Sequence, residues 1–144
     1  MTEQTRQHTN EQREIRIGKL DQIRALGYEP FGQAFNWDHS STQVIENADA
    51  LEQSGEHVRL AGRLMIIRDH GKTAFATLRD ARGDIQLYFR QDTLTDREWQ
   101  LFHLLDRGDI IGVDGIVFRT HTGEITVRVE SYTILTKALR PLPD

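Results

Sequence analysis

The sequence predicts a mainly β domain with helices. It is a five-stranded Greek-key barrel with one helix between strands three and four, preceded by an N-terminal helical extension. Three observations lead to this fold class. Five alternating or β-branched runs follow Gly55, turn residues separate most of them, and the one long gap carries a helix signal. Three strands, a helix and two strands are the order of an OB-fold.

The helical extension is predicted over residues 1–56, and its first helix spans 10–26. The apolar positions of that helix recur near helical spacing and are Ile15, Leu20, Ile23 and Leu26. Gly27 supplies a C-cap and Pro30 blocks continuation. Residues 1–9 are polar and are expected to be frayed.

A second helix is predicted over residues 42–53. Ser40 and Gln43 form a capping box before it. Its expected apolar face consists of Val44, Ile45, Ala48 and Leu51. The loop between the two helices contains three aromatic residues that are expected to pack the first helix, namely Phe31, Phe35 and Trp37.

The barrel is predicted over residues 57–135. Its strands are expected at 57–68, 73–80, 84–90, 110–119 and 124–135. The turns between them are His70-Gly71, Arg82-Gly83 and Thr122-Gly123. The helix starts at the capping box of Thr95 and Glu98, carries Trp99, Phe102 and Leu105 on one face, and is expected to end at Gly108. Residues 136–144 contain two prolines and are predicted as an extended linker toward an absent domain.

Composition excludes several classes of site. The 144 residues are enough for one core and contain no cysteine, which excludes disulfides, thiolate metal sites and cysteine nucleophiles. The six histidines lack metal-ligand spacing. No apolar run approaches the roughly 20 residues that cross a bilayer, and the N-terminus lacks a secretory signal. We therefore expect a cytoplasmic protein with no metal and no membrane partner.

The formal net charge of −4 is unevenly distributed along the chain. Residues 1–56 contain five Lys and Arg against ten Asp and Glu, whereas 57–90 contain seven against three. Because phosphate attraction acts through the local field, residues 57–90 are the segment where a polyanion would bind. An ordinary solvated strand surface has the same composition.

Strand alternation sorts the side chains of residues 73–90 into two faces. The core set is Ala74, Ala76, Leu78, Ile85, Leu87 and Phe89. The outer set is Phe75, Thr77, Arg79, Gln86, Tyr88 and Arg90. Aromatic rings stack on exposed bases, a carboxamide both donates to and accepts from a base edge, and arginines hold phosphates. OB-folds bind ligands on this face, flanked here by loops 68–72 and 119–124.

Each of these residues also has a structural interpretation. Phe75 either stacks a base or packs beneath the N-terminal helices, and for Tyr88 packing is favoured. Gln86 and Glu124 are also compatible with ordinary exposed polar positions. The residues alone support a single-strand-binding OB domain.

Several stretches carry a closer resemblance. They are KLDQIRALGYEPFGQAF (19–35), AGRLM (61–65), GKTAFATLRDARGDIQLY (71–88), LLDRGD (104–109), GDIIGVDGIVFRTHTGEI (108–125) and LTKALRPLPD (135–144). With them the chain resembles the N-terminal anticodon-binding domain of bacterial-type class II lysyl-tRNA synthetases. The stretch at 71–88 would also fit the related aspartyl and asparaginyl enzymes, and the stretch at 135–144 favours lysine.

The resemblance implies that the domain binds the anticodon stem-loop of lysine tRNA. Phe75 matches the aromatic residue that stacks on the middle base, a uridine, and Gln86 matches the residue that hydrogen-bonds its edge. Arg68 matches a basic residue supporting the same nucleotide, and Glu124 matches a residue near the first base. The family often has a basic residue where Ile67 stands here. The expected contact set is completed by Arg63, Lys72 and Arg79.

The resemblance also implies that catalysis belongs to another domain of the parent enzyme. The parent enzyme would be a homodimeric lysine–tRNA ligase that uses ATP and Mg²⁺, with its class II catalytic motifs beyond Asp144. This chain would contain no catalytic residue and need no cofactor. The alternatives are a free-standing single-stranded nucleic-acid-binding OB module, the anticodon domain of an aspartyl or asparaginyl enzyme, and a protein-interaction domain whose barrel face is covered.

Overall fold

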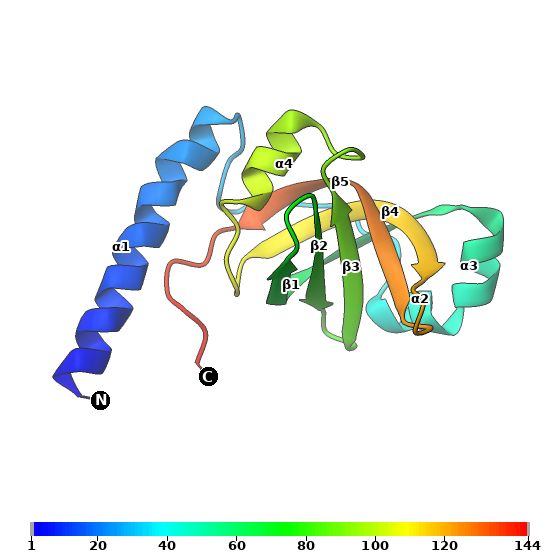
Figure 1. Ribbon diagram of the computed structural model, residues 1–144, viewed down its shortest axis with the longest axis horizontal. Helices are drawn as coiled ribbons and strands as arrows, with labels where there is room; N and C mark the ends of the chain where they lie inside the picture. Colours follow the sequence, from blue (N-terminus) through cyan, green and yellow to red (C-terminus); the bar gives the residue numbers. More distant parts are fainter. Residues whose placement is uncertain (1, 144) are drawn as a thin grey trace.

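A computed structural model describes residues 2–143; Met1 and Asp144, at the ends of the predicted extension and linker, lie outside the described residues. Five strands form a closed barrel in the order β1-β2-β3-β5-β4. Figure 1 shows the long helix α1 standing to one side of this barrel, with α2 and α3 at the other side. The predicted fold class is confirmed: a five-stranded OB-fold with a helix between β3 and β4 and helices before β1.

Each strand boundary lies within one residue of its prediction. The strands are β1 (His57–Asp69), β2 (Thr73–Arg79), β3 (Asp84–Arg90), β4 (Ile110–Arg119) and β5 (Ile125–Thr136). Four pairings are antiparallel, and the pairing of β3 with β5 is parallel. The parallel pairing closes the barrel, so no strand of the described chain is left as an open sheet edge.

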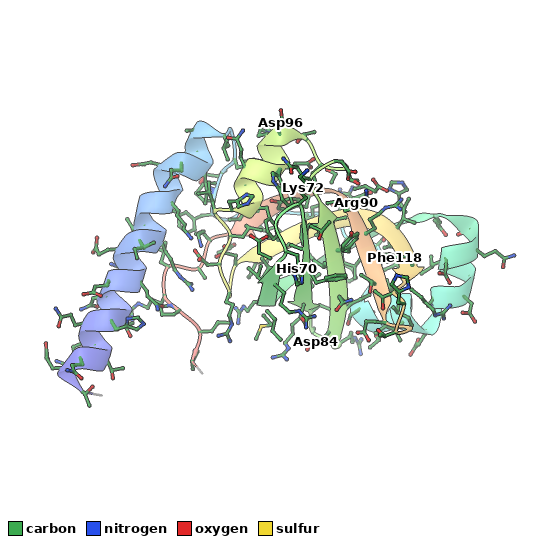
Figure 2. All side chains as sticks on the ribbon, viewed as in Figure 1. His70, Lys72, Asp84, Arg90, Asp96 and Phe118 are labelled. Carbon is green, nitrogen blue, oxygen red and sulfur yellow. The ribbon has the colours of Figure 1, made fainter. Side chains whose placement is uncertain are left out.

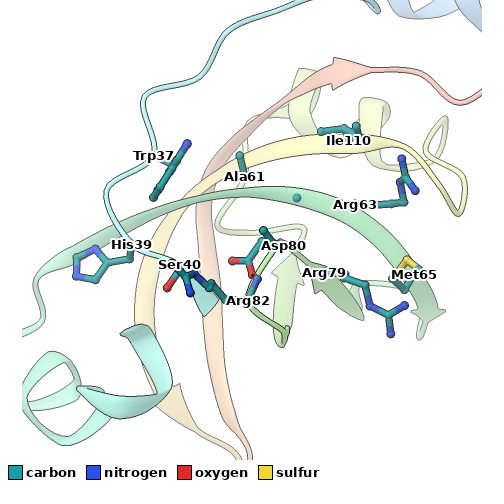
Figure 3. Close-up of a pocket in the computed structure, with 12 residues that line it drawn as sticks. Trp37, His39, Ser40, Ala61, Arg63, Met65, Arg79, Asp80, Arg82 and Ile110 are labelled. Atoms are coloured by element: carbon teal, nitrogen blue, oxygen red, sulfur yellow. The ribbon is translucent and has the colours of Figure 1, made fainter. Parts of the chain in front are cut away.

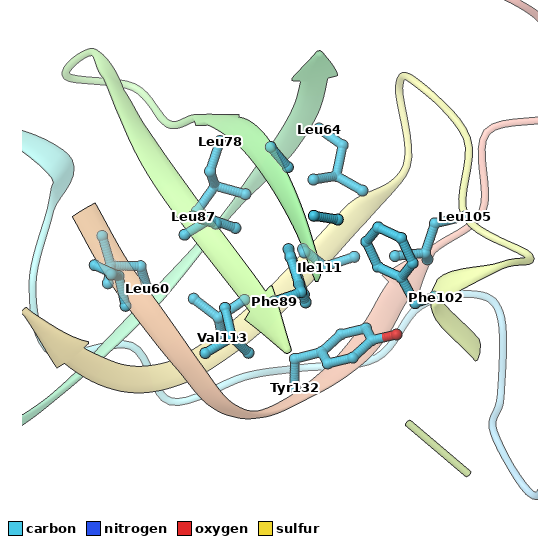
Figure 4. Packing of buried hydrophobic residues seen from close by; sticks show 14 of the residues in the cluster. Leu60, Leu64, Leu78, Leu87, Phe89, Phe102, Leu105, Ile111, Val113 and Tyr132 are labelled. Atoms are coloured by element: carbon cyan, nitrogen blue, oxygen red, sulfur yellow. The ribbon is translucent and has the colours of Figure 1, made fainter. Parts of the chain in front are cut away.

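The barrel interior is filled by the apolar residues that alternate along the strands (Figure 4). Phe89 of β3 lies at one end of this core, with its ring centroid 4.9 Å from Phe102 and 5.4 Å from Tyr132. Phe102 belongs to α4 (Asp96–Phe102), which closes that end of the barrel. Burying each large apolar side chain contributes about 1.5–3 kcal/mol, so the interior holds the strands in register.

Helix α4 begins at the predicted capping box but ends at Phe102, earlier than the expected Gly108. After the helix, Leu104 and Leu105 amides donate to Leu101 and Phe102 carbonyls, which is a tighter turn than an α-helix makes. Leu105 still reaches the core from this turn. The apolar spacing therefore marked buried positions beyond the helix itself.

The prediction for the first helix was wrong at its start. Helix α1 spans Glu3–Ala25, and the Thr2 hydroxyl caps it by accepting from the Thr5 amide. Its first turns are polar, so capping rather than apolar periodicity marks where the helix begins. Ile23 is buried, but Ile15, expected on the same face, is 62% exposed.

The second predicted helix is divided in two. Helix α2 spans Ser41–Glu46 and α3 spans Ala48–Ser54, with Asn47 between them at φ −108°. The capping box at Ser40 is present. Ile45 is exposed rather than on the apolar face. Ser41 fixes α2 to the barrel, because its backbone amide and its hydroxyl both donate to the Asp80 carboxylate at 2.7 Å.

The loop before α2 packs on the barrel rather than on α1. The Phe35 ring lies against Gly112 of β4 so closely that a Cβ there would clash at 2.5 Å. The Arg59 guanidinium stands over the same ring, 4.4 Å from its centroid. Trp37 was expected to pack the first helix, but it is 60% exposed.

The segment after β5 is anchored by buried charges. Lys137 is fully buried and its ammonium donates to Asp106 at 2.7 Å and to both oxygens of Asp109 at 2.9 Å. The Arg16 guanidinium of α1 donates to the carbonyls of Ala138 and Arg140. The beginning of the predicted linker is therefore tied to both α1 and the turn before β4.

Candidate nucleic-acid interface

A row of aromatic rings crosses the outer face of the barrel. Phe75 of β2 lies opposite Tyr88 of β3, with ring centroids 4.8 Å apart and planes tilted by 37°. Phe118 of β4 continues the row, 5.7 Å from Tyr88, and His70 meets the other side of Phe75 edge-on at 6.3 Å. Figure 2 shows His70 and Phe118 on either side of β3 on one face. The rings form a continuous apolar surface at the positions where an OB-fold binds its ligand.

The alternatives that Phe75 and Tyr88 pack beneath the N-terminal helices find no support in the structure. Both side chains are half-buried and lie outside the buried core. Their ring contacts are with each other, with His70 and with Phe118. Helix α1 stands away from this face (Figure 1). Half-exposed rings held by aromatic neighbours are suited to stacking a flat ligand.

A β-bulge brings Arg68 to the same face. The register of β1 against β2 shifts between Leu64 and Ile66. Strict alternation from buried Leu64 would direct Ile66 inward, yet Ile66 is 50% exposed and Ile67 packs against the core. The extra residue, Met65, thus reverses the alternation. As a result Arg68 is exposed and pairs with Phe75 across β1 and β2.

Gln86 is held from both sides by hydrogen bonds. The Arg68 guanidinium donates to Gln86 Oε1 at 3.2 Å, and Gln86 Nε2 donates to Thr126 Oγ1 at 3.0 Å. The contact with Thr126 exists because β3 pairs in parallel with β5, where Gln86 and Thr126 are partners. The carboxamide therefore stands in a fixed position next to the strand that carries Phe75.

Glu124 lies in the loop between β4 and β5. Its backbone amide donates to the Thr120 hydroxyl at 3.1 Å, and its carbonyl accepts from the Thr120 amide at 3.0 Å. Gly123 before it has φ +85°, a conformation that favours glycine and lets the loop turn tightly. The Thr126 hydroxyl also donates to the Glu124 carbonyl at 3.1 Å, which connects this loop to Gln86.

Three predicted contact residues remain, namely Arg79, Arg63 and Lys72. Arg79 pairs with Asp84 through two hydrogen bonds of 2.7 and 3.0 Å, which hold the pKa of the Asp84 carboxyl below its ordinary value. Arg63 is the partner of Arg79 across β1 and β2, at the far end from Arg68. Lys72 is exposed in the loop between β1 and β2, beside a cleft that Arg90 also lines.

A separate groove lies at that far end and not on the aromatic row. The groove has a volume of about 580 Å³. Among the residues that line it are Trp37, Arg63, Arg79 and Arg82 (Figure 3). Neither Phe75 nor Gln86 lines it. Of the seven predicted contact residues, Phe75, Gln86, Arg68 and Glu124 are thus connected, and Arg63 and Arg79 border a separate groove.

Two residues of the cluster were not predicted. Phe118 is the outward position at the end of β4, and the alternation of buried Val113 and Val117 would have revealed it. Thr126 sits on β5 between Gln86 of β3 and Phe118 of β4. Its position depends on the parallel strand pairing, for which the sequence offers no local signal.

Residues 2–143 contain neither a candidate metal site nor a candidate membrane span. In that range no three His, Asp or Glu side chains come together in a way that would hold a metal ion. No helix in the same range is long and apolar enough to span a membrane.

The chain is similar to known proteins over most of its length. Residues 58–135 match the model of the tRNA anticodon family, described as an OB-fold nucleic acid binding domain. A lysine–tRNA ligase of Moorella thermoacetica is 51% identical over 130 residues, which cover 90% of this chain and 26% of that protein. The lysine–tRNA ligase of Bacillus subtilis strain 168 is 42% identical over 99% of this chain and 30% of its own length. The chain thus spans less than a third of these relatives.

Proposed function

Because the chain belongs to the tRNA anticodon family of OB-fold nucleic acid binding domains, we propose that it binds the anticodon stem-loop of lysine tRNA and reads the middle base. The lysine identity is supported by relatives that are lysine–tRNA ligases. The single observation that carries the base reading is the pair of Phe75 and Tyr88 rings in contact beside a carboxamide held on both sides.

Each residue of the cluster has a proposed task. The Phe75 ring stacks on the middle base, a contribution of about 1–3 kcal/mol. Gln86 donates to and accepts from the Watson–Crick edge of that base. The Arg68 guanidinium supports the same nucleotide and supplies positive charge close to the stacked ring. Glu124 lies beside the first anticodon base.

The other basic residues are proposed to act on the phosphate backbone. Lys72 is exposed in the loop next to Arg68, and Arg63 and Arg79 lie along the same two strands further away. We also propose that residues 1–56 support the barrel formed by 57–135, and that 136–144 lead to the rest of the parent protein.

Ligation of lysine to tRNA with ATP and Mg²⁺ is proposed for the part of the relatives' length that this chain does not span. No residue of the cluster is assigned to that chemistry. A homodimeric parent and a cytoplasmic location complete the proposal.

Binding of RNA stem-loops to the 144-residue chain tests this function. We expect salt-sensitive binding of a lysine-tRNA anticodon stem-loop, because phosphate contacts release counterions. We also expect weaker binding when the middle uridine is replaced. Equal binding of all replaced loops would leave a generic single-strand-binding module. Absence of binding at low salt would instead support a protein-interaction domain.

A further inference from the structure

Thr126 occupies an unusual place beside the reading carboxamide. It is fully buried, although it is polar, and lies on β5 as the partner of Gln86 on one side and Phe118 on the other. Its hydroxyl makes two hydrogen bonds, one with Gln86 Nε2 at 3.0 Å and one with the Glu124 carbonyl at 3.1 Å. A buried hydroxyl with both contacts made is expected to be rigid.

The chemistry of these contacts determines which way the carboxamide faces. A hydroxyl has one hydrogen, and a carbonyl oxygen can only accept, so the Thr126 hydrogen is directed to the Glu124 carbonyl. Toward Gln86 the same hydroxyl must therefore accept, which requires the amide nitrogen and excludes the amide oxygen. On the other side Arg68 can only donate, which requires the amide oxygen there. Both neighbours thus impose one orientation.

That orientation matters because uracil and cytosine present opposite patterns. Uracil offers a donor at N3 and an acceptor at O4, whereas cytosine offers an acceptor at N3 and a donor at N4. A carboxamide that faces positions 3 and 4 of the ring matches either base, but only after turning its oxygen and nitrogen through 180°. After the contacts with Arg68 and Thr126, Gln86 retains one free lone pair on its oxygen and one free hydrogen on its nitrogen.

We propose that Thr126 is a specificity-determining positioning residue, whose hydroxyl locks the Gln86 carboxamide in the orientation that accepts uracil and rejects cytosine. The inference rests on the proposed function, in which Gln86 reads the base stacked on Phe75. It adds a residue that touches no base and still decides which pyrimidine fits. Thr126 also joins the reading of the middle base to the loop that carries Glu124.

A matched pair of variants tests the lock. Thr126→Val keeps the shape and removes the hydroxyl, whereas Thr126→Ser keeps the hydroxyl. Affinities are measured for stem-loops with uridine or cytidine at the middle position. We expect the wild-type chain and Thr126→Ser to prefer uridine by about tenfold. For Thr126→Val the preference should fall below about threefold, with cytidine binding gained, because only Arg68 then opposes the turn of the amide, and its exposed side chain is able to move aside.

The outcomes separate the two proposals. A full uridine preference in folded Thr126→Val would overturn the lock and leave the proposed function standing. A wild-type chain that binds uridine and cytidine loops equally would instead contradict the proposed function, and the lock with it.

A second measurement needs no variant and no RNA. In the wild-type chain, nuclear Overhauser contacts should connect the Gln86 side-chain amide hydrogens with the Thr126 side chain. If these hydrogens instead contact the Arg68 side, the carboxamide faces the other way and the proposed lock is wrong. This test decides the matter even if Thr126→Val does not fold.

Discussion

Arg68 of β1 lies directly opposite Phe75 of β2, and it does so because β1 bulges at Met65. The bulge turns Ile67 toward the core and Arg68 toward the aromatic face. One inserted residue therefore places a guanidinium next to the ring proposed to stack a base. It also brings that guanidinium within 3.2 Å of Gln86.

Two aromatic residues, Phe75 and Trp37, should differ in their effect on RNA binding. Phe75→Ala should weaken binding of the lysine-tRNA stem-loop by about 1–3 kcal/mol, because one stacking contact is lost. Trp37→Ala is the control, since Trp37 is an exposed aromatic residue that lines the separate groove. Fluorescence anisotropy titrations of the two variants check this. A larger loss for Trp37→Ala would move the binding face to that groove.

Lys137 should be important for stability. Lys137→Met removes the cation from between two carboxylates and leaves buried Asp109 unpaired, so we expect a loss of about 3–5 kcal/mol in urea unfolding. The double variant Lys137→Met with Asp109→Asn removes the uncompensated charge and should recover part of the loss. If the single and double variants had the same free energy of unfolding, the unpaired Asp109 charge would not be the cause of the lost stability.

Replacement by alanine should change the stability of the chain in opposite directions at Gly115 and Gly18. A Cβ on Gly115 would clash with the Arg128 carbonyl of the neighbouring strand, so Gly115→Ala should destabilise the barrel by more than about 2 kcal/mol. Gly18 lies inside α1 with nothing within 4 Å of the added carbon. Gly18→Ala should stabilise the chain by up to about 1 kcal/mol. Thermal unfolding of both variants measures the contrast.

Stability should fall as the solution becomes acidic. Burial by itself would raise the pKa of Asp80, but hydrogen bonds from Ser41 and from the Arg82 and Gly83 amides outweigh it, so the pKa lies below its ordinary value of 3.8. The pKa of Glu98 is likewise lowered, because bonds from Thr95, Tyr132 and Ser131 outweigh its burial. As the pH falls, the unfolded chain therefore takes up protons before the folded chain does. The stability that these two carboxylates contribute is complete above their ordinary pKa values, and it is lost as the pH falls through their lowered values in the folded chain.

Urea unfolding between about pH 6 and pH 3 measures this dependence. The variant Asp80→Asn should be less stable at pH 6 and should show a shallower decline, because one contributing carboxylate is gone. A free energy of unfolding that rises toward pH 3 would contradict the proposed origin of the acid sensitivity in these two carboxylates.

Local sequence patterns predicted the barrel and the outward positions on β2 and β3. Alternation placed Phe75 and Gln86 on one face because β2 and β3 are regular, with each residue paired across a uniform ladder. The capping boxes at Ser40 and Thr95 marked two helix starts correctly. The polar start of α1 was missed, because nothing apolar repeats there and a Thr2 cap alone starts the helix.

The rest depends on contacts between distant strands. Without the register of β1 against β2, the bulge at Met65 cannot be located, and strict alternation would turn Arg68 inward. Thr126 reaches Gln86 only through the parallel pairing of β3 with β5. Resemblance supplied Arg68 and Glu124, and the three-dimensional structure supplied Thr126. Phe118 was within reach of alternation in β4.

The most direct test of base reading combines a residue change with a base change. Binding is measured for the wild-type chain and Gln86→Ala, each with stem-loops carrying uridine or cytidine at the middle position. If Gln86 reads this base, the wild-type chain prefers uridine by about tenfold, and Gln86→Ala loses that preference mainly through weaker uridine binding. A wild-type preference that persists in Gln86→Ala would show that another group reads the base.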